Sequence, residues 1–118
     1  MSAPNIVNVT TITGKTSVVT LSTSTANVVT NSANSNSIVK LNNIVLSNFA
    51  ATTVTANVVL NRSSINYYLG GTVAIPPNST LILLGKDTSI YLEEGDVIQA
   101  NVSANSSVSF TGSYEIIS

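Results

Sequence analysis

The run Ile98-Gln99-Ala100-Asn101-Val102-Ser103 decides the fold of this chain. Apolar and polar residues alternate at every position, which is the period of a β-strand with one buried face and one face in water. Residues 108–116 repeat the pattern around Gly112. We predict that both runs are strands and that they form a hairpin through residues 104–107.

Upstream segments show the same alternation. Thr53, Thr55 and Asn57 alternate with the apolar residues Val54, Ala56, Val58 and Leu60, and the β-branched residues here favour an extended backbone. Between residues 39 and 46 the apolar phase changes, which predicts a bulge, a bend or a passage between sheets at Asn42-Asn43.

Turn-forming residues separate these short runs, and no segment has a sustained helical period. The predicted breaks are Gly14-Lys15, Gly70-Gly71, Pro76-Pro77-Asn78, Gly85-Lys86-Asp87 and Glu94-Gly95-Asp96, with a polar loop at residues 30–36. Eight to ten short strands without helices predict an all-β fold, an antiparallel β-sandwich of jelly-roll type, with a small β-barrel as the alternative.

Composition restricts the chemistry that this chain can perform. Its 118 residues suit a single β domain over residues 1–118, with 43% hydrophobic and 8% charged residues. There is no His, no Cys and no Trp, so the usual catalytic bases and thiolate ligands are missing. We predict a protein that is not an enzyme and has no catalytic residue, no cofactor and no metal.

Charge and hydropathy limit the partners. The formal net charge is -1, and the basic residues Lys15, Lys40, Arg62 and Lys86 are scattered, which does not favour nucleic-acid binding. No run approaches the ~20 apolar residues of a membrane span, and no signal peptide is evident. We therefore expect neither nucleic acid nor membrane as a partner.

The acidic residues cluster at Asp87, Glu93, Glu94 and Asp96. Carboxylates on adjacent turns are ligands that Ca²⁺ prefers, and paired acids can hydrolyse glycosidic bonds. Their spacing matches no calcium loop, and few aromatic residues are present to hold a sugar. We interpret them as solvated turns in which Gly95 supplies a positive φ.

Two short segments are candidate interfaces. Leu81, Ile82, Leu83 and Leu84 make both faces of one strand apolar, which indicates cover on both sides, by a neighbouring subunit or by a loop of the same chain. Tyr67 and Tyr68 point to opposite faces if extended, so one of them is expected to be exposed and to contact a partner.

Three stretches carry a resemblance to a known class of proteins: Asn5-Ile6-Val7-Asn8-Val9-Thr10-Thr11-Ile12-Thr13-Gly14-Lys15, Lys86-Asp87-Thr88-Ser89-Ile90-Tyr91-Leu92-Glu93-Glu94-Gly95-Asp96 and Ser113-Tyr114-Glu115-Ile116-Ile117-Ser118. They resemble small virion structural proteins of tailed bacteriophages, especially those that infect marine cyanobacteria. The resemblance implies a decoration, neck or tail accessory module that is assembled in the host cytoplasm and located in the virion. It implies homo-oligomers and other virion proteins as partners, and it brings no catalytic residues.

Two other functions stay open at this stage. The first is a carbohydrate- or receptor-binding module of fibre-tip type, with specificity in Tyr and Asn side chains on loops. The second is a secreted adhesin-like domain, which the missing export signal disfavours.

Overall fold

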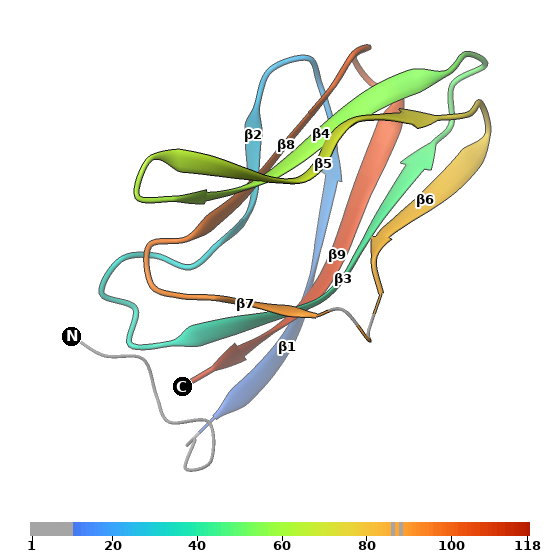
Figure 1. The fold of residues 1–118 in the computed structure, drawn as a ribbon. Helices are drawn as coiled ribbons and strands as arrows, with labels where there is room; N and C mark the ends of the chain where they lie inside the picture. The colour runs from blue at the N-terminus through green and yellow to red at the C-terminus, as the bar shows by residue number, and fades with distance from the viewer. Residues whose placement is uncertain (1–10, 86, 88) are drawn as a thin grey trace.

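The computed structural model describes residues 11–85, 87 and 89–118. Residues 5–10 of the first resembling stretch, and Lys86 and Thr88 of the second, lie outside the described residues. The chain folds into nine strands: β1 (Ile12–Thr20), β2 (Ala26–Thr30), β3 (Ile38–Asn48), β4 (Val54–Arg62), β5 (Ile65–Ile75), β6 (Ser79–Leu84), β7 (Ile90–Leu92), β8 (Val97–Val102) and β9 (Val108–Ile117) (Figure 1).

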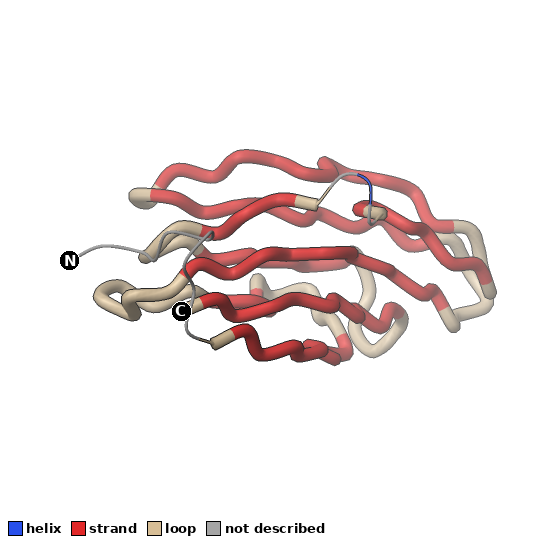
Figure 2. The backbone as a smooth tube through the Cα atoms, turned by 90° about the horizontal axis from the view of Figure 1, so that it is seen from below, coloured by secondary structure: helices blue, strands red, loops and turns tan. Residues whose placement is uncertain are grey.

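The strands form two antiparallel sheets. The first has the order β1-β9-β3-β6, with β7 paired to the first half of β3, and the second has the order β2-β8-β4-β5. Figure 2 shows that most of the described backbone is strand, joined by short loops. Within the described residues no ladder joins the two sheets, so the predicted sandwich is confirmed and the closed barrel is not formed.

The pairings are nested. With β7 set aside, the first strand pairs with the last, β2 with β8, β3 with β6, and β4 with β5. This is the pattern of one long hairpin folded over into two layers, which is a jelly roll. The predicted jelly-roll architecture is therefore confirmed.

The phase change in β3 is a bulge. The β3–β9 register shifts between Leu41 and Asn43, so Asn42 is the extra residue. Leu41 and Ile44 are both fully buried although they are three positions apart. The bulge lets β3 keep its apolar side inward while its two halves pair with different strands, β7 and β6.

The core lies between the two sheets. Its largest side chain is Phe110 on β9, which is fully buried among Leu, Ile and Val from both sheets. Beside it, a Cβ added at Gly112 would lie 3.0 Å from Phe110 Cε1. The absence of a side chain at Gly112 therefore makes room for the ring.

The predicted hairpin through residues 104–107 is wrong. β8 belongs to one sheet and β9 to the other, so this connection crosses between layers. Alternation shows that each run has a buried side, but it does not show which strand lies beside it. Both strands instead pair with segments far away in sequence.

The predicted breaks have mixed outcomes. Gly95 does adopt a positive φ, +91°, in the turn before β8, and residues 76–78 do separate β5 from β6. Gly14 lies inside β1, and Gly70-Gly71 lies inside β5, at irregularities of the β4–β5 ladder. A glycine can therefore mark a bulge within a strand as well as a turn between strands.

The β4–β5 hairpin turn has no glycine. Ser63 and Ser64 both have positive φ, 54° and 64°, which is the signature of a type I′ turn that usually uses Asn or Gly. Serine is an unusual residue for this conformation, which explains why the sequence pattern gave no prediction of the turn.

Candidate functional site

Exposed apolar side chains gather on the strands that have a free edge. β1 and β6 border the first sheet, β2 and β5 border the second, and β7 pairs only with β3 among the described strands. All of these strands except β2 carry exposed large hydrophobic residues, which are Ile12, Val18, Ile65, Tyr67, Tyr68, Ile82 and Tyr91, and one more, Phe49, lies in the connection after β3. The sandwich therefore places its unburied apolar surface where another chain could pair.

Strand β6 is apolar on both faces, as predicted. Leu81, Leu83 and Leu84 pack against the core, while Ile82 is 67% exposed. Leu83 also bridges the two layers, because its Cδ1 lies 3.0 Å from the position that a Cβ of Gly70 on β5 would take. This chain thus covers the inner face of β6 and leaves Ile82 in water, and the interface assignment of the strand stays a prediction.

Ile82 belongs to a row that crosses the whole outer face of the first sheet. It pairs with Val45 on β3, Val45 pairs with Thr111 on β9, and Thr111 pairs with Val18 on β1. Val18 is 71% exposed. The row therefore has an exposed aliphatic side chain at each edge and β-branched residues between them.

Both tyrosines of β5 are exposed, Tyr67 at 52% and Tyr68 at 64%. Exposure of only one of them was expected. Tyr68 pairs with Val59 and Tyr67 with Leu60, a residue that packs against the core. β5 is an edge strand near the hairpin tip, so it lacks neighbours that would cover Tyr67. Whether either ring contacts a partner stays a prediction.

Tyr68 borders a shallow hollow of about 120 Å³ on the outer face of the second sheet. The hollow is lined mainly by side chains of four neighbouring strand segments: Thr25, Asn57, Val59, Asn66, Tyr68, Gln99, Ala100 and Asn101. The alternation showed that Asn57, Gln99 and Asn101 are on polar faces, but it did not show that the strands carrying them are adjacent. We refer to these residues as the amide trough.

Hydrogen bonds connect the trough across the sheet. The Asn57 Nδ2 donates to Asn101 Oδ1 at 3.0 Å, and Asn101 Nδ2 donates to Thr25 Oγ1 at 2.9 Å. The backbone N–H of Thr72 donates to Asn57 Oδ1 at 2.7 Å. These bonds hold the amides in fixed orientations above the sheet.

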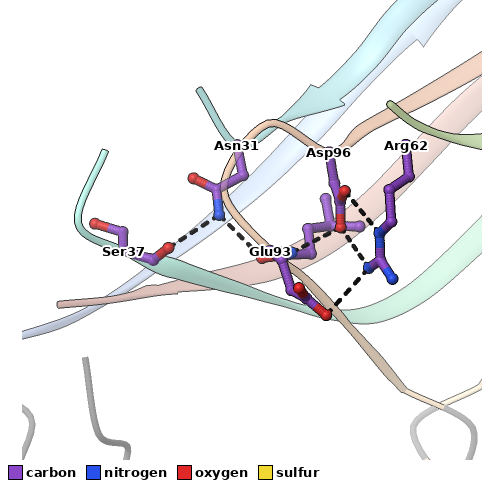
Figure 3. A network of polar contacts seen from close by, with 6 residues as sticks. Asn31, Ser37, Arg62, Glu93 and Asp96 are labelled. Atoms are coloured by element: carbon purple, nitrogen blue, oxygen red, sulfur yellow. Dashed lines mark hydrogen bonds and ion pairs between the residues drawn. The ribbon is translucent and has the colours of Figure 1, made fainter. Parts of the chain in front are cut away.

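A second polar cluster closes one end of the sandwich (Figure 3). Arg62, at the end of β4, donates from Nε to Asp96 Oδ1 at 2.9 Å and from Nη2 to Asp96 Oδ2 at 2.6 Å. Asp96 is 2% exposed and also accepts the Glu93 N–H at 2.8 Å. The hydrogen bond to Asp96 raises the pKa of Arg62. We call this group the Arg62–Asp96 clasp.

Asn31 extends the clasp to the loop before β3. Its buried Nδ2 donates to the carbonyls of Ser37 and Leu92 at 3.0 and 2.9 Å (Figure 3), and its backbone N–H donates to the Asp96 carbonyl at 2.9 Å. The loop predicted at residues 30–36 is therefore anchored at Asn31. Asp96 is buried, so the expectation of solvated acidic turns is wrong for this residue. Glu94 accepts the Asn36 N–H at 2.7 Å, and no group of His, Cys, Asp and Glu suited to a metal ion occurs among the described residues.

In the part of the chain that the structure describes, no helix has the length and apolar character needed to cross a membrane.

Comparisons with known proteins identify the fold only. No family model and no curated protein matches the sequence. Among solved structures, the chain is similar to one in the acidic stable capsid of Helicobacter pylori bacteriophage KHP30, at 9% identity and a TM-score of 0.55, over 94% of this chain and 90% of that one. It is also similar to a chain of Bacillus endospore appendages, described as disulfide-linked pili, at 11% identity and a TM-score of 0.49, over 91% and 87% of the two chains.

Proposed function

We propose that this protein is a non-enzymatic structural component of a phage virion, a decoration or neck and tail accessory module that binds copies of itself and other virion proteins. The structural likeness to a phage capsid chain supports an assembly role for this jelly roll. The resemblance of residues 86–96 and 113–118 to virion proteins of tailed phages supports the same location. The cyanobacterial host suggested by that resemblance is part of the proposal.

The observation that carries the proposal is the open edge of β6. Natural proteins protect edge strands with Lys, Pro or bulges that turn the edge away. β6 reads Ser79-Thr80-Leu81-Ile82-Leu83-Leu84, without a charge or a proline, and its bulge at Leu83 lets both Leu83 and Leu84 pack against the core. Such an edge is a template for strand addition by another chain.

Burial of Ile82 adds a favourable term to that pairing. Complete burial of an Ile side chain stabilises by about 1.5–3 kcal/mol, and Ile82 still has two thirds of its surface to lose. Each copy that covers Ile82 therefore gains roughly 1–2 kcal/mol from this residue. In a symmetric oligomer the gain recurs at every interface.

Light scattering over a concentration series tests the proposal with two lysine variants. We expect the wild type to form a defined oligomer and Ile82→Lys to be a folded monomer, because the lysine is tolerated in water but not between chains. Thr53→Lys adds the same charge in an exposed loop and should leave the mass unchanged. A wild type that is monomeric at every concentration, or an Ile82→Lys variant that keeps the wild-type mass, would overturn the assignment.

A further inference from the structure

The two outer faces of the sandwich differ in chemistry. The outer face of the first sheet mixes Thr, Ser and Val with Ile, Lys and Glu. The second sheet instead places Asn57, Gln99 and Asn101 side by side at the centre of its outer face. Asn is depleted in strands, and departures from local preference are expected where a surface has a function.

The trough amides retain unused hydrogen-bonding capacity. Each Asn uses one Nδ2 hydrogen in the bonds across the sheet, and Gln99 donates from Nε2 to Asn27 Oδ1 at 2.8 Å. Each amide nitrogen carries two hydrogens. Within the described residues, the second hydrogen of each amide and the Gln99 Oε1 have no protein partner. The trough therefore offers both donors and an acceptor to a ligand.

Tyr68 adds an apolar wall to the trough. Its ring lies beside Gly71, where an added Cβ would be 3.4 Å from the ring atom Cδ2. Val59, which is almost fully buried, forms part of the floor. An aromatic ring next to fixed amides matches a sugar ring, which has C–H groups on its faces and hydroxyl groups that donate and accept at its rim.

We propose that the amide trough binds a neutral hexopyranose unit of a glycan. No charged side chain lines the trough, so the site has no partner for the carboxylate of a uronic or sialic acid, which would lose hydration on binding. The fixed amides select hydroxyl positions, and Tyr68 packs against the sugar face. This inference goes beyond the assembly role, and neither one depends on the other.

A glycan array followed by NMR titration tests the site. The array carries gluco-, manno- and galacto-configured neutral trisaccharides together with sialylated and uronate-containing ones. We expect binding to neutral members only. In ¹⁵N-labelled protein, the best binder should shift the side-chain NH₂ signals of Asn57, Gln99 and Asn101, a change that a purely structural role of these amides would not produce.

Adjacent residues supply matched variants. Tyr68→Ala and Gln99→Met should each weaken binding at least about tenfold, since an anchor ring or a paired amide is lost. Tyr67→Ala removes another exposed ring, from the other side of β5, and should bind as the wild type does. No neutral binder on the array, a preference for acidic glycans, or equal binding by Tyr68→Ala and wild type would overturn the proposal. The Ile82→Lys variant is altered on the other sheet and should bind the glycan as the wild type does, so the glycan test is independent of the assembly test.

Discussion

Replacing Arg62 with methionine should destabilise the domain by leaving a buried carboxylate without its cation. The Asp96 side chain is 2% exposed and would lose hydrogen bonds of 2.9 and 2.6 Å while it keeps the Glu93 N–H. Removing one member of a buried ion pair costs about 3–5 kcal/mol. Because the Arg62 side chain is 41% exposed, water replaces part of the contact, and we expect a loss of about 2–3 kcal/mol.

Urea unfolding followed by circular dichroism measures this loss, and the melting temperature should fall by roughly 10 °C for a domain of this size. Glu93→Gln is the control: its side chain is 70% exposed and lies 3.4 Å from Arg62, so it should change stability by less than about 0.5 kcal/mol. The double variant Arg62→Met with Asp96→Asn should recover part of the loss. A loss below about 1 kcal/mol for Arg62→Met, or a double variant no more stable than the single one, would refute the reasoning.

The effect of pH on the clasp has a definite sign. Asp96 raises the pKa of Arg62 in the folded state. A cation whose pKa is higher in the folded state than in the unfolded state contributes its full stabilisation at any pH below the unfolded-state pKa. It loses this contribution only as the pH rises through the folded-state pKa. The contribution of Arg62 should therefore stay constant from neutral pH to about pH 10, because arginine titrates only above that range.

Four further substitutions test the packing. Leu83→Asp places a carboxylate against the core, so we expect insoluble protein on expression; a soluble variant with the wild-type melting temperature would contradict the packing of β6. Gly95→Val forces a β-branched residue to a φ of +91° and should cost about 1–2 kcal/mol in urea unfolding; an unchanged midpoint would exclude strain there. Gly112→Val should lower the melting temperature by displacing Phe110, whereas a neutral effect would mean that the ring has space to move. Asn48→Leu removes the donor that reaches the carbonyls of Thr52 and Ile75 at 3.0 and 2.9 Å. It should lower the free energy of unfolding by about 1–3 kcal/mol, and a variant as stable as the wild type would contradict this role.

The all-β class was predictable because period-two alternation and short spacing restrict the chain to a sandwich or a small barrel, of which the structure shows the sandwich. An irregularity at Asn42-Asn43 was predictable because the buried phase changes there, and the structure shows which of the three expected forms it takes, a bulge. The partner of each strand was not predictable: β8 and β9 follow one another in sequence yet lie in different sheets. Strand order depends on how all the apolar faces close together, which no local pattern contains.

The candidate sites also differ in whether the sequence alone could reveal them. The apolar character of β6 is local, so the sequence revealed it. The amide trough combines Thr25, Asn57, Tyr68 and Gln99 from four segments, whereas sugar-binding residues were expected on loops. The clasp is equally non-local, because Arg62 and Asp96 meet only after β4 has packed beside β8.

The position of β9 has a consequence for how this protein is made. β9 lies between β1 and β3. The central strand of the first sheet is therefore missing until β9 has left the ribosome. Until then β1 and β3 expose edges and apolar faces that have no native partner. A topology with such distant contacts folds slowly and presents a target for chaperones or for misassembly between nascent chains. The yield in a cell should therefore depend on how crowded the newly made copies are.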